Sequence, residues 1–278
     1  MIANFYRPAR PGRAPAILLL GGSEGGLGKA AAAQAAALAA HGYVVLQLSY
    51  FGSPGQPAAL KSIPVETFTR ALDWLKTQPG VAGNRIGIVG TSKGAEAALL
   101  VASRRSDLKI AVLGVPSSVV WPGIDRQGLV TESSWTEGGR PVPFTPMDGR
   151  GMARHPCPVC RRAGRSGQGR NGRHPGRARE GRHRDGLWRG GWAVAVLPDG
   201  AGGRSTVARR QLSTSRHGAC LSRRGPCRFR PAPDPASQAA STAASLGGSI
   251  AGNRAARVDG WPKVLAALDA VLMPEAGR

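Results

Sequence analysis

The stretch Gly90-Thr91-Ser92-Lys93-Gly94-Ala95-Glu96 decides how the rest of the sequence is understood. It follows the apolar run 86–89, which has the length of a buried strand, and leads into the helix-forming residues 97–102. Glycines on either side of Ser92 allow a sharp turn from strand to helix, with the serine hydroxyl exposed above the sheet. Ser92 is therefore a candidate nucleophile, and the backbone amide of Lys93 is a candidate donor to an oxyanion. The alternative is an accidental serine in a glycine-rich turn.

Strand-like and helix-like segments alternate through the first 115 residues. Apolar runs predict buried strands at residues 16–20, 43–48, 86–89 and 110–113. Helices are expected at residues 30–40, from Pro64 as a first helical residue, and directly after Ser92. This alternation predicts an α/β fold with a mostly parallel sheet flanked by helices. Sites in such sheets form at the carboxyl ends of strands, where residues 21–24 and Ser92 both fall.

The glycine-rich residues 21–29 do not fit a phosphate-binding loop. A Walker loop would need glycine at Ser23 and a hydroxyl residue at Ala30, and a dinucleotide fingerprint lacks its third glycine. We expect instead that the backbone amides of Ser23 and Glu24 join that of Lys93 in an oxyanion hole. No cofactor and no metal are expected.

Further motifs accompany the corner at Ser92. They are Leu20-Gly-Gly-Ser-Glu-Gly-Gly-Leu27, Tyr50-Phe51-Gly52, Ile63-Pro-Val-Glu66, Trp74-Leu75, Glu132-Ser-Ser-Trp135, Pro141-Val-Pro-Phe144, Leu246-Gly-Gly-Ser-Ile-Ala-Gly-Asn253 and Asp259-Gly-Trp-Pro-Lys-Val-Leu265. In this order they resemble the acyl-CoA thioester hydrolase and bile acid-CoA:amino acid N-acyltransferase family. The resemblance is to its C-terminal α/β-hydrolase domain, in a compact form without an accessory β-rich domain. It covers about residues 1–150 and 246–273.

The resemblance implies that Ser92 is acylated by a small-molecule acyl thioester and that water or an amine then resolves the acyl-enzyme. This chemistry needs a histidine base and a carboxylate, in the chain order Ser, Asp, His. The family's motifs for both are absent from residues 151–246, where they would be expected. The printed residues offer Asp185 as the acid and His217 as the base, and behind them Asp199 and His183.

The positive charge is concentrated in one segment. The net charge is +22, but residues 1–150 contain 15 basic and 9 acidic side chains, whereas residues 151–246 contain 19 arginines and only 4 acidic side chains. That middle segment has no Lys, Ile or Tyr and little apolar periodicity. It divides the chain into a front half of a hydrolase domain (1–150), an Arg/Gly/Pro-rich segment (151–246) and a C-terminal helical part (247–278). One interpretation is a disordered, Arg-rich segment that binds nucleic acid.

The preferred interpretation of the middle segment is translation in a shifted reading frame of a GC-rich gene. Residues 221–227 can be encoded CTA TCC CGG CGC GGG CCA TGC, which one nucleotide later reads Tyr-Pro-Gly-Ala-Gly-His, the histidine motif of the family. Residues 192–199 can in the same way hide Gly-Gln-Trp-Pro-Ser, its acid-side motif. Two motifs in order and in one frame favour a shifted frame over an authentic insert.

Other features of the sequence are less informative. The apolar run 16–20 is too short to span a bilayer, so we expect a soluble cytoplasmic protein without a membrane partner. His41 precedes a glycine and is expected to cap a helix. The cysteines lack the second close pair of a zinc site, so incidental thiols are preferred; they are Cys157, Cys160, Cys220 and Cys227. The oligomeric state stays open.

The sequence leaves three function hypotheses. The first is an acyl-CoA thioesterase or related serine hydrolase, the second a hydrolase-like protein without activity, and the third an Arg-rich nucleic-acid-binding protein. Within the middle segment only residues 192–197 have the pattern of a strand. We therefore expect an ordered front half, a poorly ordered middle, and a C-terminal helix at residues 261–272 whose docking partner is in doubt.

Overall fold

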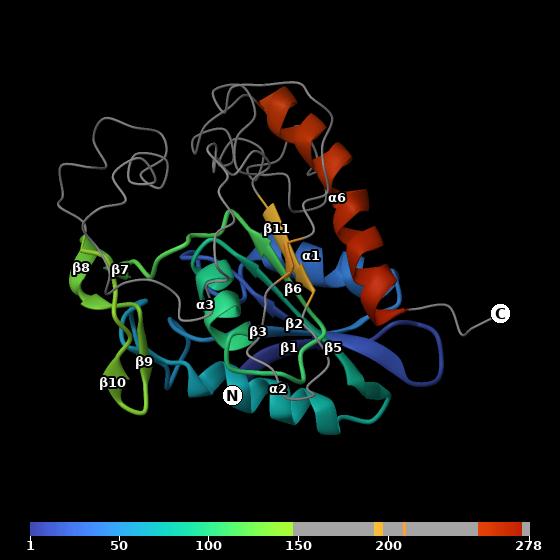
Figure 1. The fold of residues 1–278 in the computed structure, drawn as a ribbon, viewed down its shortest axis with the longest axis horizontal. Coiled ribbons are helices and arrows are strands. Elements are labelled where there is room, and N and C mark those ends of the chain that lie inside the picture. The colour runs from blue at the N-terminus through green and yellow to red at the C-terminus, as the bar shows by residue number, and fades with distance from the viewer. Residues whose placement is uncertain (147–191, 197–207, 210–249, 274–278) are drawn as a thin grey trace.

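The apolar runs of the first half of the chain form the centre of a seven-stranded sheet (Figure 1). The structure is a computed structural model that describes residues 1–146, 192–196, 208–209 and 250–273. Across the sheet the strands are β1 (Ile2–Tyr6), β3 (Val44–Ser49), β2 (Ala14–Leu20), β5 (Val81–Thr91), β6 (Ile110–Gly114), β11 (Trp192–Val196) and β12 (Ala208–Arg209). The central strands β3, β2, β5 and β6 are parallel, and the outer strands pair antiparallel.

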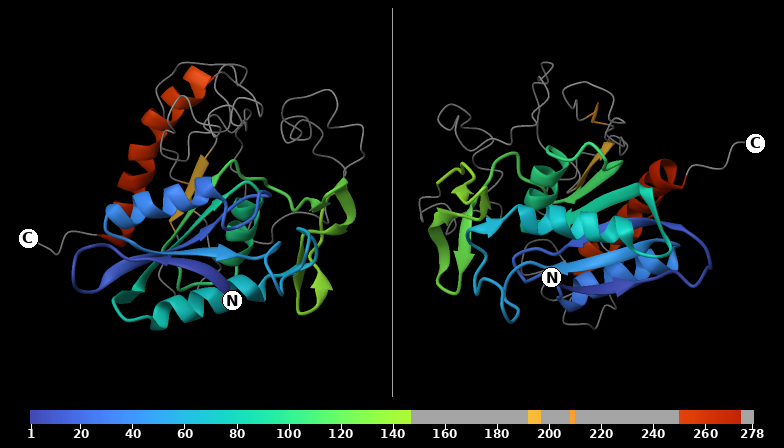
Figure 2. Two further views of the ribbon diagram at one scale, coloured as in Figure 1. Left: turned by 180° about the vertical axis from the view of Figure 1, so that it is seen from behind. Right: turned by 90° about the horizontal axis from the view of Figure 1, so that it is seen from below.

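Within the described part of the chain, four helices cover the two faces of this sheet (Figure 2). They are α1 (Lys29–Ala40), α2 (Glu66–Thr77), α3 (Lys93–Ala102) and α6 (Ile250–Leu272). Alternate residues of β2 face opposite ways: Leu18 packs in a core cluster with α2 and α3, and Ile17 packs in a second cluster with α1 and α6. Because both faces are buried, the strands at the centre of the sheet are mostly apolar. The expected α/β fold, with a mostly parallel sheet flanked by helices, is confirmed.

An excursion of the chain follows β6. Residues 115–146, called here the excursion, contain the short strands β7 (Pro122–Asp125), β8 (Gly128–Ser133), β9 (Trp135–Glu137) and β10 (Arg140–Pro141). The strands β7 and β8 form a hairpin, and β9 pairs with β10 and with β4 (Ile63–Pro64). The excursion therefore lies beside the start of α2, at one end of the molecule (Figure 1).

The expectation that Pro64 begins a helix is wrong. Pro64 lies in β4, and α2 begins at Glu66. The amides of Ile63 and Val65 donate to carbonyl oxygens of β9 and the residue before it, whereas the amide position of residue 64 needs no partner. Proline lacks an N–H group, so it fits this position of a two-residue strand. Strand pairing with residues 72 positions later thus overrides the local preference for a helix.

The C-terminal helix begins earlier than expected and does have a docking partner. It starts at Ile250, and Val264, Leu268 and Leu272 are fully buried against the face of the sheet that includes Ile17. The expected doubt about its docking is therefore wrong, because β2, β5 and β6 leave an apolar face that α1 covers only in part.

Two residues that follow α1, His41 and Tyr43, bind Asp269 of α6. The ring of His41 lies 2.9 Å from Asp269 (Nε2 to Oδ2), and the hydroxyl of Tyr43 donates to Asp269 Oδ1 at 2.6 Å. His41 also occupies the C-terminal cap of α1, which confirms its expected role.

The strand expected near residue 192 is present, but it runs antiparallel to β6. Trp192 pairs with Gly114 and Val196 with Ile110, so the chain enters β11 at the edge of the sheet where Ser92 lies. The other expectations for residues 151–246 concern positions outside the described residues. Among the helices that the structure describes, none combines the length and the hydropathy needed to cross a bilayer.

Candidate active site

Ser92 lies at the corner between β5 and α3, and its backbone has φ 54° and ψ −118°. A positive φ is rare for a residue with a Cβ atom and must be maintained by its surroundings. The amide of Ser92 donates to the carbonyl of Gly114 at 2.8 Å, and its own carbonyl accepts from the amides of Ala95 and Glu96 at 2.9 and 3.1 Å. The side chain is exposed. The corner thus presents a hydroxyl group to solvent at the carboxyl edge of the sheet.

Close backbone contacts at glycines maintain this corner. A Cβ atom added to Gly94 would lie 2.2 Å from the carbonyl oxygen of Gly21 and 2.5 Å from that of Leu20. One added to Gly90 would lie 2.2 Å from the carbonyl oxygen of Gly94. Both positions therefore require glycine: Gly94 because α3 begins in direct contact with the end of β2, and Gly90 because the start of α3 packs against it.

The loop between β2 and α1 lies next to Ser92. A Cβ atom on Gly22 would lie 3.2 Å from the Cβ of Ser92. Ser23 and Glu24 follow in an exposed turn that closes with a hydrogen bond of 3.3 Å from the amide of Gly25 to the carbonyl of Gly22. The structure thus brings this loop to the corner at Ser92, as the sequence predicted.

Lys93 supplies a backbone amide at the same corner. It is the first residue of α3, and amides in the first turn of a helix have no partner within the helix. Amides in this position stabilise negative charge, such as that on the oxygen of a tetrahedral intermediate.

Tyr50 is hydrogen-bonded to the loop between β2 and α1, a role that the sequence alone does not indicate. Its hydroxyl donates to the carbonyl of Gly21 at 2.7 Å and lies 3.2 Å from that of Gly22. Burial raises the pKa of Tyr50 well above its ordinary value, and the charges of Glu24 and Glu96 raise it further. The phenol therefore stays protonated and remains a donor.

Gln47 supports the same loop from β3. Its side-chain amide donates to the carbonyl of Gly26 at 2.9 Å, and the residue is fully buried. A glutamine between the apolar residues Leu46 and Leu48 is the signal in the sequence, because buried polar groups are almost always hydrogen-bonded.

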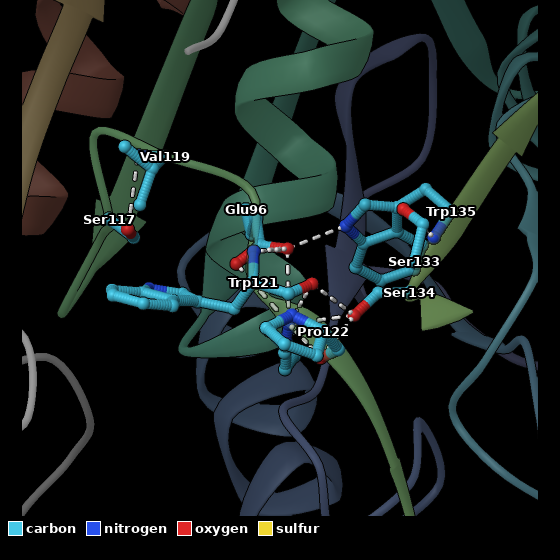
Figure 3. Close-up of polar contacts among 9 residues, drawn as sticks. Glu96, Ser117, Val119, Trp121, Pro122, Ser133, Ser134 and Trp135 are labelled. Atoms are coloured by element: carbon cyan, nitrogen blue, oxygen red, sulfur yellow. Dashed lines mark hydrogen bonds and ion pairs between the residues drawn. The ribbon is translucent and has the colours of Figure 1, made fainter. Parts of the chain in front are cut away.

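The side chain of Lys93 is buried rather than directed to solvent. Its ammonium group contacts Glu96, Ser134 and the backbone carbonyls of Trp121 and Pro122. Glu96 also accepts from the indole of Trp135 (Figure 3). Burial lowers the pKa of Lys93 and raises that of Glu96, and in each case the charge of the partner opposes the effect of burial. The sequence alone indicates a role only for the backbone of Lys93.

The candidate acid and base do not lie in the described part of the chain. Asp185 and His217, their alternatives Asp199 and His183, and all four cysteines belong to positions outside the described residues. Among residues 1–146, 192–196, 208–209 and 250–273, no group of three or more His, Cys, Asp or Glu side chains could hold a metal ion.

Comparison with known proteins supports the resemblance stated above. Residues 63–132 match the family described as "BAAT / Acyl-CoA thioester hydrolase C terminal". The chain is 34% identical over 111 residues to mouse mitochondrial acyl-coenzyme A thioesterase 2, a match that covers 40% of this chain and 24% of that protein. It is 37% identical over 98 residues to mouse acyl-coenzyme A amino acid N-acyltransferase 1, which covers 35% and 23%. The chain thus spans about a quarter of the length of the curated relatives that it matches.

Similar solved structures include α/β hydrolases. A hypothetical protein from Pseudomonas aeruginosa is 29% identical, with 42% of this chain and 39% of that chain covered at a TM-score of 0.36. A putative dienelactone hydrolase from Klebsiella pneumoniae is 15% identical, with 49% and 70% covered at a TM-score of 0.36.

Proposed function

We propose that the protein is a serine hydrolase of acyl-CoA-type thioesters that acts through an acyl-enzyme on Ser92. The observation that carries the proposal is the exposed serine at positive φ, at the carboxyl edge of the sheet and beside a loop of backbone donors. Similarity to acyl-CoA thioesterases supports the class of substrate. The proposed place of action is the cytoplasm, as expected from the sequence.

The proposed reaction has two steps. Ser92 Oγ attacks the thioester carbonyl carbon and passes its proton to a base, and the carbonyl oxygen becomes an oxyanion. The amides of Lys93 and of Ser23 or Glu24 stabilise that charge. The C–S bond then breaks, the leaving thiolate takes the proton, and water attacks the acyl-serine ester to release the acid and restore Ser92. An amine in place of water would give an amide.

The base and the acid belong to the proposal as well. For the chain as printed they are His217 and Asp185, which follow Ser92 in the order that the fold requires. The shifted frame of residues 151–246 offers a different pair. Sequencing the source DNA across codons 145 to 250 decides between them: single-nucleotide errors would restore the family's two motifs, and an unchanged sequence would leave Asp185 and His217.

Labelling with a fluorophosphonate probe tests the nucleophile. We expect the full chain to be labelled and Ser92→Ala to lose labelling by at least about a thousandfold, because the probe reacts only with an activated serine. Ser103→Ala is the matched control, since Ser103 caps the opposite end of α3 and should leave labelling unchanged.

Thiol release from an acyl-CoA should follow the same pattern in these variants. Equal labelling of wild type and Ser92→Ala would refute the role of Ser92. A folded wild type without labelling would assign the chain to the hydrolase-like proteins without activity.

A further inference from the structure

A buried polar network joins α3 to the excursion and begins at Lys93, the residue after Ser92. The Lys93 network consists of the side chains of Lys93, Glu96, Ser134 and Trp135 and the backbone of Trp121 and Pro122 (Figure 3). Lys93 is 6% exposed and Glu96 is 2% exposed. Charged residues are almost never buried to this extent unless they are paired, so the network calls for an explanation.

The hydrogen bonds fit an ionised pair. Lys93 Nζ lies 2.7 Å from Ser134 Oγ, 3.0 Å from the carbonyl of Pro122, 3.2 Å from that of Trp121 and 3.1 Å from Glu96 Oε1, all of which can accept. Glu96 Oε1 receives the indole N–H of Trp135 at 2.7 Å and the amide of Trp121 at 3.2 Å. Donors surround the carboxylate and acceptors surround the ammonium group, which is the arrangement of a charged pair.

The excursion supplies most of these partners. Apart from the Lys93–Glu96 contact itself, every hydrogen bond just described comes from residues 121–122 or 134–135. A buried ion pair is tolerated only when its remaining donors and acceptors are also satisfied. The pair therefore holds the excursion in one position on α3, and the excursion in turn holds the pair.

Lys93 is also the residue that follows the strained corner. Its amide is the first of α3, and the conformation of Ser92 persists only if the residues on both sides are fixed. On the side of the sheet, the hydrogen bond from the amide of Ser92 to the carbonyl of Gly114 holds the corner in place. Fixing the side chain of Lys93 limits rotation on the helix side, and with it the direction of the amide that would face an oxyanion.

From these contacts we infer that Lys93, Glu96 and Ser134 are positioning residues, which couple the docked excursion to the orientation of Ser92 and of the Lys93 amide. This inference rests on the proposed function. It assigns the network to the reactivity of Ser92 and not to the affinity for the acyl group, because none of its side chains is exposed at the corner. Residues of the excursion thereby act on the nucleophile without touching it.

A matched control is available in an exposed ion pair. Lys61 Nζ lies 3.1 Å from Glu132 Oε1, and this ion pair also connects the excursion to the rest of the domain. The side chains of Lys61 and Glu132 are, however, 40% and 51% exposed. Lys61→Met therefore removes a lysine contact to the excursion without altering the residue next to Ser92.

The test uses the full chain and two readouts. The variants are Ser134→Ala, which removes one partner of Lys93, and Lys93→Met/Glu96→Gln, which removes both charges and leaves no unpaired ion. The first readout is the kinetics of fluorophosphonate labelling, resolved into a maximal rate and an apparent affinity. The second is hydrogen exchange of the amides of residues 92–97, measured by mass spectrometry.

We expect both variants to lower the maximal labelling rate by about tenfold with the apparent affinity unchanged, and Lys61→Met to label like the wild type. Exchange of residues 92–97 should rise about tenfold in the two variants alone. Variants that melt like the wild type and label at its rate would overturn the inference.

If the wild type itself is not labelled, the proposed function fails and exchange alone decides the coupling. Faster exchange in Ser134→Ala but not in Lys61→Met would support it, and equal exchange would refute it.

Discussion

Ser92 has a strained backbone conformation, and close packing at Gly90 and Gly94 keeps it in place. The backbone strands and the helix approach one another more closely than any residue with a Cβ atom would allow. Strain of this kind costs on the order of 1–3 kcal/mol, so it is kept only where the surrounding packing enforces it. At Ser92 the packing comes from the end of β2 as much as from the corner itself.

The substitution Gly94→Ala should destabilise the protein by about 1–3 kcal/mol, because its Cβ atom would overlap the carbonyl oxygens of Gly21 and Leu20. Urea unfolding measures the loss, and labelling of Ser92 should fall with it. Gly28→Ala is the control, since its nearest neighbour would be 3.4 Å away and its φ of −60° suits alanine. A wild-type urea midpoint for Gly94→Ala would contradict the close contact.

Local pattern was enough to predict the corner at Ser92, but not the environment of Lys93. Two glycines and a change from strand to helix within a few residues define the corner. A lysine in a sequence indicates a solvated side chain, and the residues that bury this one lie 28 to 41 positions later. Contacts across such distances in the chain have no local signature.

At the scale of elements, the strands and helices of the first half were predictable because each carries its own periodicity. The corrections share one cause, which is pairing between segments distant in sequence. Pro64 pairs with Thr136 of β9 instead of beginning a helix. Helix α6 packs on one face of the sheet. The apolar runs of the strands do not show by themselves that α1 leaves part of this face uncovered.

The docking of α6 predicts the effect of Leu268→Ala. Leu268 is fully buried in the cluster with Ile17 and Val112, so truncation should cost about 2–5 kcal/mol in the free energy of unfolding. Val258→Ala, on the same helix but at a residue that is 60% exposed, should change it by less than about 0.5 kcal/mol. Equal urea midpoints for the two variants would mean that α6 does not pack on the sheet.

At the scale of the whole molecule, ion pairs at the surface connect segments that are distant in the sequence. Asp107 accepts from Arg105 at 2.7 and 2.8 Å and from Lys76 of α2 at 2.6 Å. The hydrogen bonds from Arg105, then that from Lys76, hold the pKa of Asp107 well below its ordinary value, although burial opposes them. The carboxylate is a third exposed, so solvent screening keeps its contribution to about 1 kcal/mol.

This pair predicts a part of the stability that depends on pH. The folded pKa of Asp107 lies below the unfolded value of about 3.9, so its stabilisation is complete above that value and is lost as the pH falls toward the folded pKa. Asp107→Asn should therefore be less stable than wild type by about 1 kcal/mol at pH 7, with a difference that shrinks below about pH 4.

Urea unfolding from pH 7 to pH 3 measures this difference. Asp125→Asn is the control, because an amide oxygen can still accept from the backbone of Gln127. A difference between Asp107→Asn and wild type that does not vary with pH would argue against the ion pair.

The position of α6 also sets the order in which the fold can be completed. The described strand residues that pack with it lie within the first 114 residues, whereas Val264, Leu268 and Leu272 are among the last described residues to be synthesised. Until they leave the ribosome, the sheet has a helix layer on one face and a partly bare apolar surface, which includes Val89 and Val112, on the other. Surfaces of this kind bind chaperones or associate with other nascent chains. The interval before α6 arrives is thus the period in which this protein is most exposed to aggregation.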